Sequence, residues 1–364
     1  MNNRIYYMDA MRGILILLIV VIHSLQVFNP DSKWLLHSNN TVKFAPYIIE
    51  ILMFFVLPSF FIISGFFAAM SISKSGIENF FDSKLKRILI PIFMAAITLN
   101  SLQTFLLIKN NWMKFELRNY ITKGEWISHL WFLIDLAIFF FLLYISVKFF
   151  KLIVKKIINK IDIIFNKISI ILFLFLFSFI IVILLILVSI TSKYIYNEII
   201  NIHSIAYYLP FFMLGTLLYI NKKILNKLLK IPFWNSLLIV IISLYFSNYL
   251  ITLDGKLYKI LYYFFNITAH VFSSVLCLLI FNKFMNKKSD LLLFLADASY
   301  TIYLFHHVVV VAIAILLIKL NIGGVYGLVV LITSSSIVSI IIHKTLILKI
   351  NLLSFLYNGK VIKK

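Results

Sequence analysis

Charged residues are scarce in this chain, and acidic residues are the scarcest of them. Only 13% of the 364 residues are charged, and 13 Asp and Glu stand against 34 Lys and Arg. A soluble domain averages about 25% charged and 45–50% apolar residues, whereas this chain is 62% hydrophobic. The shortage of charge excludes a globular soluble domain and predicts an all-α, polytopic membrane protein.

Cysteine, proline and glycine are also few. The one cysteine, Cys277, lies in an apolar run, so no disulfide or cysteine-based metal site can form within the chain. With 6 Pro and 10 Gly, few helices are interrupted, which disfavours a transporter built on broken helices. The sequence has no Walker loop, no HExxH zinc helix and no G-x-S-x-G elbow, and we expect no metal site.

Long apolar runs are what the chain has instead. A membrane helix needs about 17–25 apolar residues, and ten such runs can be placed. We predict one membrane domain over residues 1–364, with spans near 10–28, 47–71, 88–108, 129–147, 169–190, 204–220, 236–252, 260–281, 299–318 and 325–343.

The basic residues explain the net charge of +21 without a nucleic-acid partner. They lie in the short connections between apolar runs. If the N-terminus is inside, 23 of them fall in the inner segments and 10 in the outer ones. This bias predicts that both termini are cytoplasmic and that the number of spans is even.

The first span carries polar residues on one face. Arg12 and His23 are eleven residues apart, which places them within about 20° around a helix and about 16 Å along it. Asp9 lies one turn before Arg12. Charged and titratable groups are costly in hydrocarbon, so this column predicts a polar site in the bilayer, with His23 as general acid or base. The alternatives are a histidine bonded to a backbone carbonyl and an ion pair that fixes helix depth.

Three further segments hold candidate residues. Lys84 and Arg87 suit either the positive-inside rule or the phosphates of a cytosolic donor. At the outer start of the fourth span, His129 and Trp131 could contact a sugar substrate, and Asp135, an acid about one and a half turns deeper in the span, needs a partner. In the ninth span, one helix face carries Ser299, Tyr303 and His306, and His307 points about 100° away from it. That polar face either joins helices or brings a second histidine to the first span.

Taken together, these segments resemble the acyltransferase 3 family of bacterial membrane acyltransferases. Within the family, residues 64–69 and 127–133 look most similar to the glucan-modifying succinyltransferase branch. The resemblance rests on six pieces in order: Asp9-x-x-Arg12 with Arg12-x10-His23, Phe60-Phe61-Ile62-Ile63-Ser64-Gly65-Phe66, Lys84-x-x-Arg87-Ile88-x-x-Pro91, His129-Leu130-Trp131-Phe132-Leu133, Phe211-Phe212-Met213-Leu214-Gly215 and Ser299-Tyr300-x-Ile302-Tyr303-Leu304-x-His306.

The resemblance implies a ten-helix domain in the inner membrane of a bacterium. It implies transfer of an acetyl or succinyl group from an acyl-CoA co-substrate, with no bound cofactor, to a carbohydrate of the cell envelope. The family's arginine and histidine correspond to Arg12 and His23. Its basic pair corresponds to Lys84 and Arg87, where lysine keeps the charge but lacks the two-pronged guanidinium.

Two other classes of protein remain open from the residues alone. A non-catalytic carrier or flippase for a lipid-linked sugar fits ten spans and basic inner loops equally well. An oligosaccharide polymerase usually needs a large outer loop, and the longest outer connection here, near 109–128, has only about twenty residues.

Overall fold

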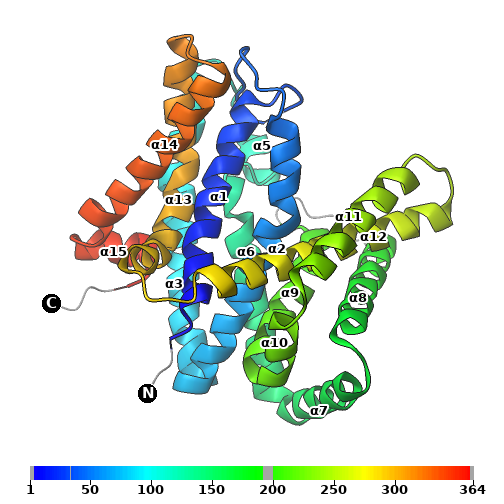
Figure 1. Ribbon diagram of the computed structural model, residues 1–364. Helices are drawn as coiled ribbons and strands as arrows, with labels where there is room; N and C mark the ends of the chain where they lie inside the picture. The colour runs from blue at the N-terminus through cyan, green and yellow to red at the C-terminus, as the bar shows by residue number, and fades with distance from the viewer. Residues whose placement is uncertain (1–3, 33, 192–199, 361–364) are drawn as a thin grey trace.

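The chain is a bundle of helices in a computed structural model, which describes residues 4–32, 34–191 and 200–360 (Figure 1). Within those ranges there is no strand, and ten helical segments are long and apolar enough to cross a membrane, as predicted. The spans are α1 (Tyr6–Phe28), α2 (Ala45–Ser75), α3 (Ile77–Ala95) continued by a π-helical turn (Ala96–Asn100) and α4 (Ser101–Lys109), α6 (Trp131–Phe149), α8 (Ile170–Thr191), α9 (Ile202–Ile220), α11 (Phe233–Leu250), α12 (Lys256–Phe284), α13 (Asp290–Lys319) and α14 (Gly324–Ile342).

Shorter helices lie in the connections: α5 (Leu117–Thr122), α7 (Lys151–Lys167), α10 (Lys222–Leu229) and α15 (Asn351–Asn358). The helix α7 lies across the lower end of the bundle in Figure 1. It is amphipathic, with five lysines and exposed aliphatic side chains such as Leu152 and Ile157. This composition is typical of a helix that lies in the membrane interface.

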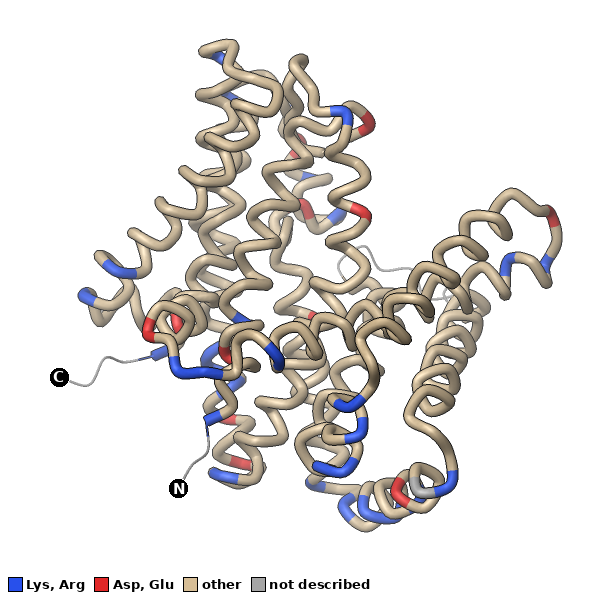
Figure 2. Tube along the Cα trace, viewed as in Figure 1, with Lys and Arg blue, Asp and Glu red and all other residues tan. Residues whose placement is uncertain are grey.

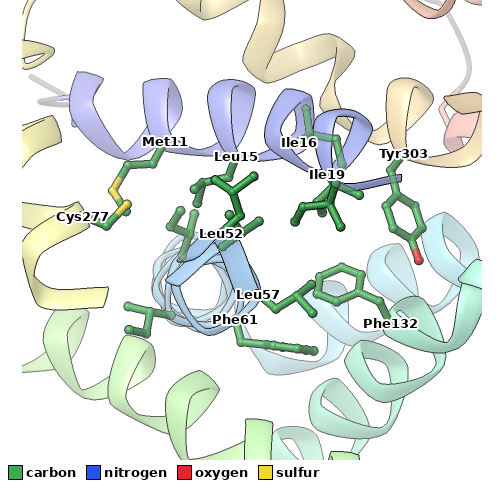
Figure 3. Close-up of a cluster of buried hydrophobic side chains, with 14 of the residues drawn as sticks. Met11, Leu15, Ile16, Ile19, Leu52, Leu57, Phe61, Phe132, Cys277 and Tyr303 are labelled. Atoms are coloured by element: carbon green, nitrogen blue, oxygen red, sulfur yellow. The ribbon is translucent and has the colours of Figure 1, made fainter. Parts of the chain in front are cut away.

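The helix α1 lies at the centre of the part of the bundle that holds the site, against α2, α13 and α14. Its apolar face contributes to a continuous buried core (Figure 3). Because α1 is held on several sides, the polar residues that it carries are fixed relative to α2 and α13. The core residues labelled in Figure 3 are Met11, Leu15, Ile16 and Ile19 of α1, Leu52, Leu57 and Phe61 of α2, Phe132 of α6, Cys277 of α12 and Tyr303 of α13.

Two glycines allow α2 and α9 to pack backbone against backbone. A Cβ atom added at Gly65 would lie 1.9 Å from the carbonyl oxygen of Phe212, and one added at Gly215 would lie 1.9 Å from that of Ile62. Small residues at a helix crossing are a common device in membrane bundles. These glycines belong to two of the six sequence pieces, which therefore have a packing role.

Basic residues gather at the lower end of the bundle, where α1 begins and α15 also lies (Figure 2). The upper end holds few of them. This distribution is the one that the positive-inside rule describes for a cytoplasmic face.

Candidate active site

A basic cavity of about 200 Å³ opens among α1, α2, α3, α6, α13 and the end of α15. Its wall contains the predicted donor contacts Lys84 and Arg87, together with Arg12 of the first span and Lys360. The structure therefore brings together residues far apart in the chain. Its polar lining residues are Arg12, Ser64, Lys84, Arg87, Asp297, Ser299, Tyr300, Tyr303, Asn358 and Lys360.

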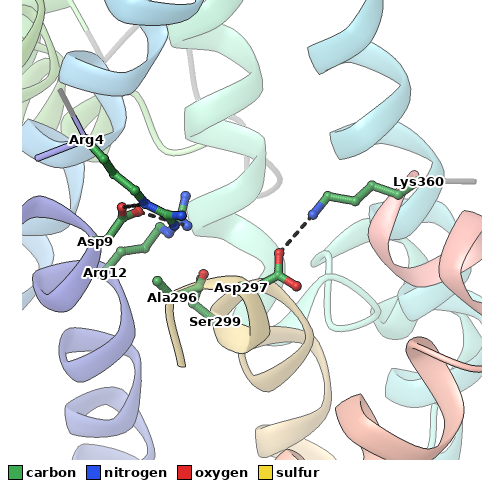
Figure 4. A network of polar contacts seen from close by, with 7 residues as sticks. All are labelled: Arg4, Asp9, Arg12, Ala296, Asp297, Ser299 and Lys360. Atoms are coloured by element: carbon green, nitrogen blue, oxygen red, sulfur yellow. Dashed lines mark hydrogen bonds and ion pairs between the residues drawn. The ribbon is translucent and has the colours of Figure 1, made fainter. Parts of the chain in front are cut away.

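Asp9 positions the arginines at the start of α1. Its carboxylate accepts a hydrogen bond from Nε of Arg4 at 2.7 Å and contacts Nη2 of Arg12 at 3.4 Å (Figure 4). The bond to Asp9 raises the pKa of Arg4. The guanidinium of Arg12 also lies over the ring of Phe67, with Cζ 5.3 Å from the ring centroid. Asp9 is 5% exposed and does not line the cavity, so it acts on the site through Arg12.

Asp297 lies opposite this pair and is held from the C-terminal side of the protein. Nζ of Lys360 donates to its Oδ1 at 3.1 Å (Figure 4). Nε2 of His343 lies 3.8 Å from Oδ2, and Nδ1 of His343 is 2.8 Å from Oγ1 of Thr301. Asp297 is the one carboxylate in a cavity wall whose other charged residues are basic, and the positive charge of Lys360 balances its negative charge.

A second cavity, of about 400 Å³, lies further along α1 and contains His23. We call it the histidine cavity, because His129 and His307 also line it, together with Trp34 and Trp131. Its other lining residues are Ile19, Ile22, Gln26, Leu35, Met53, Leu57, Ser128, Phe132 and Tyr303.

Four imidazole rings meet at this cavity. The ring centroid of His307 lies 4.8 Å from that of His23 and 4.5 Å from that of His129. The His306 centroid is 5.2 Å from that of His23, although His306 is fully buried and lies behind the lining. Nδ1 of His23 and Nε2 of His306 are buried without a hydrogen-bond partner in the described ranges. No three His, Cys, Asp or Glu side chains of the described chain are arranged to hold a metal ion.

The two cavities meet at Phe132 and Tyr303, which line both of them. The hydroxyl of Tyr303 donates to the backbone carbonyl of His129, and its ring centroid lies 5.5 Å from that of Phe132. A group in the basic cavity is therefore separated from His23 by these two aromatic side chains.

The residues singled out in the ninth and fourth spans lie at different distances from the two cavities. Ser299 and Tyr303 line the basic cavity, whereas His306 lies behind the lining of the histidine cavity, with its ring centroid 5.2 Å from that of His23. His307 lies about 100° around α13 from that face, and it is His307, not His306, that lines the histidine cavity. Asp135 lines neither cavity, and its partner is Ser204, whose Oγ lies 2.5 Å from Oδ2.

Trp34, Gln103 and Lys360 are site residues that the sequence analysis did not identify. Trp34 stacks on His23 with ring centroids 5.6 Å apart. Gln103 contacts His307. In the sequence, Lys360 cannot be told from the other basic residues near it. Gln103 could have been singled out, because a polar amide inside an apolar span often marks a functional site.

The chain is similar in sequence to a known family of membrane enzymes and to named bacterial proteins. The family model described as an acyltransferase domain matches residues 5–344. The chain is 26% identical to the glucans biosynthesis protein C of Escherichia coli O81 (strain ED1a), of Escherichia coli K12 and of Shigella dysenteriae serotype 1, in alignments that cover 100% of this chain and 96% of each relative. No solved structure matches the chain.

Proposed function

The chain belongs to the acyltransferase 3 family of multi-pass membrane acyltransferases, and we propose that it moves an acetyl or succinyl group from a cytosolic acyl-CoA to a hydroxyl of a cell-envelope glucan. The observation that carries the proposal is the pair of cavities joined at Phe132 and Tyr303. One cavity is rich in cations and the other in imidazoles, which suits a reaction whose two substrates arrive from opposite sides of a membrane.

The donor is assigned to the basic cavity. Coenzyme A carries several phosphate groups, and guanidinium and ammonium groups are the side chains that bind phosphate best. Arg12, Lys84 and Arg87 are its contacts in this proposal. Arg12, Lys84, Arg87 and Lys360 line the cavity, and Lys and Arg gather at the lower end of the bundle (Figure 2), so in this proposal the donor enters from the cytoplasm of a bacterium whose inner membrane holds the protein.

The acceptor is assigned to the histidine cavity. Tryptophan faces stack well on sugar rings, and Trp34 and Trp131 both line this cavity. Relatives over the full length of the chain are named glucans biosynthesis protein C, which supports a glucan as the acceptor.

Lipid surrounds the exposed apolar faces of the spans, such as that of α8.

The acyl group has to pass Phe132 and Tyr303 to reach His23. In the transfer, the acceptor oxygen forms a bond to the acyl carbon, the bond from that carbon to sulfur breaks, and the hydroxyl proton ends on the thiolate. His23 either takes this proton as a general base or first carries the acyl group on a ring nitrogen. Ser299 and His306 shape the walls, and Asp9 holds Arg12.

The test is acyl transfer in membranes that contain the protein. Labelled acetyl-CoA and succinyl-CoA are supplied separately, and the envelope glucans are analysed for label and for a mass gain of one acyl group. We expect one of the two labels to enter glucan, and we expect His23→Ala, inserted at normal levels, to abolish that entry. Unmodified glucan that crosses the membrane without label would instead identify a carrier, and His23→Ala membranes that label glucan normally would overturn the role of His23.

A further inference from the structure

Gln103 and His307 form a buried pair across the interface of α4 and α13. Each side chain is 3% exposed, and Nδ1 of His307 lies 2.5 Å from Oε1 of Gln103. An amide oxygen accepts hydrogen bonds but cannot donate them. Nδ1 of His307 therefore carries the proton, and Nε2 keeps its lone pair.

The amide of Gln103 is oriented by its other end. Its Nε2 faces Oγ of Ser128 at 3.4 Å, and this hydroxyl oxygen accepts from it. Ser128 has a φ of +48°, a conformation that few residues with a Cβ adopt. Ser128 directly precedes His129, so Gln103 links the turn that carries one imidazole to the ring of another.

A local irregularity of the third span aims these amides inward. The π-helical turn Ala96–Asn100 stands directly before α4, and such turns are rare and often occur at functional sites. Nδ2 of Asn100 donates to the carbonyl oxygens of Trp126 at 2.7 Å and Ile127 at 3.0 Å. The turn thereby places Asn100 and Gln103 together against the 126–129 segment.

The ring of His307 lies among the groups that the reaction needs. It lines the histidine cavity, and its centroid is 4.8 Å from that of His23 in an edge-on arrangement. A hydroxyl group in this cavity can approach His307 while the acyl group is at His23. If His23 carries the acyl group, its own nitrogen is occupied and the acceptor hydroxyl needs another base.

We propose that His307 is the base that takes the proton from the acceptor hydroxyl, and that Gln103 is the positioning residue that keeps its Nε2 unprotonated. This inference rests on the proposed function and leaves His23 with the acyl-carrying role. The hydroxyl oxygen forms its bond to the acyl carbon and gives its proton to Nε2 of His307. The bond from that carbon to the His23 nitrogen breaks, and its electron pair returns to His23. The proton then leaves His307 for water, and the thiolate that the donor released in the first half has taken its own proton from water, so that the overall transfer balances.

The experiment separates the two halves of the reaction in purified protein reconstituted in lipid. Without acceptor, release of free CoA thiol in a single turnover reports acyl transfer to the enzyme. With glucan, label in the glucan reports the second half. We expect His307→Gln to keep thiol release but to lower labelling of glucan at least about a hundredfold, as loss of a general base does. His23→Ala should lose both, and His37→Gln, in an exposed outer loop, should lose neither.

Gln103 is tested by a conservative pair of variants. Gln103→Glu keeps an oxygen that accepts from Nδ1, so glucan labelling should stay close to that of the natural protein. Gln103→Leu removes the acceptor, and we expect kcat to fall about 10-fold to 100-fold, as for other partners that orient a reactive imidazole, with the donor KM unchanged. If Gln103→Leu does not accumulate in membranes, the thiol release and glucan labelling of His307→Gln decide whether the inference holds.

Three results would overturn the inference: normal glucan labelling by His307→Gln, equal loss of thiol release and glucan labelling in that variant, or equal activity of the Leu and Glu variants at position 103. Natural protein that labels no glucan at all would instead remove the proposed function on which the inference rests.

Discussion

Phe132 and Tyr303 lie between the two cavities with their ring centroids 5.5 Å apart and their planes tilted by 53°, and each lines both cavities. Phe132 comes from α6 and Tyr303 from α13. The hydroxyl of Tyr303 donates a hydrogen bond to the backbone carbonyl of His129. The side chain of Phe132 has no such bond and can change its rotamer more easily than that of Tyr303. Under the proposed function, passage between the two cavities therefore depends on the size of this residue.

We predict that Phe132→Trp lowers kcat for acyl transfer by roughly tenfold or more, because a displaced reacting group loses rate steeply. The donor KM should stay the same, because the basic cavity keeps its cations. Phe132→Leu should retain transfer. The matched control is Phe141→Trp on the same helix, whose side chain is 49% exposed. Initial rates at saturating donor decide, and a fall in both tryptophan variants would contradict a specific passage.

Removing the charge at Arg12 should weaken donor binding. A hydrogen bond to a charged group contributes about 1.5–3 kcal/mol, so Arg12→Gln should raise the donor KM roughly tenfold or more. The donor KM of Arg12→Lys should lie between those of the natural protein and of Arg12→Gln, because lysine keeps the charge but lacks the planar guanidinium. The control is Arg118→Gln on α5, an exposed residue that lines neither cavity. Equal donor KM values for the Gln variants at 12 and 118 would remove Arg12 from the donor site.

The segment after α15 should be needed for the shape of the basic cavity. Gly359 has a φ of +58°, and a Cβ added there would lie 2.4 Å from Cα of Arg87. Gly359→Ala therefore moves Asn358 and Lys360, and we expect a higher donor KM. Gly76→Ala is the matched control, because Gly76 also has a positive φ, of +80°, but open space around it. Each change costs about 1–3 kcal/mol of backbone strain, so only the donor KM separates them.

The crossing of α2 and α9 should be the most sensitive packing contact. Gly65→Ala places a methyl group against the backbone carbonyl of Phe212, and relief requires the helices to move apart. Overpacking of this kind costs about 1–3 kcal/mol or more. We expect a lower midpoint of thermal unfolding in detergent and less protein in membranes. Gly324→Ala, with a φ of +62° and no neighbour within 4 Å, should lower the midpoint less.

Hydropathy predicted the number of spans but not their ends. The third span was predicted over 88–108, whereas the helix begins at Ile77, because a helix can extend into water beyond its apolar part. The helices α7 and α15 were not predicted, since short amphipathic or polar stretches carry no membrane signal. The relative positions of Asp9, Arg12 and His23 on α1 follow from helical spacing alone, because all three residues lie on one helix.

The contacts between distant segments could not be predicted in the same way. Gln103 and His307 are 204 positions apart, and no periodicity within either helix relates them. Asp135 shows the opposite case, since a buried acid looked like a site residue but is paired with Ser204 outside both cavities. A single sequence shows which reactive or charged side chains each helix carries. Only the packing of the helices determines which of these side chains come into contact.

The central claim is that an acyl group crosses from the basic face to the histidine cavity. The most direct measurement uses proteoliposomes in which the protein has one known orientation, with labelled acyl-CoA on the side of the basic cavity and glucan on the other side. We predict that label enters the enclosed glucan with the natural protein and not with His23→Ala. Label that enters glucan only when both substrates share one side of the membrane would contradict the route.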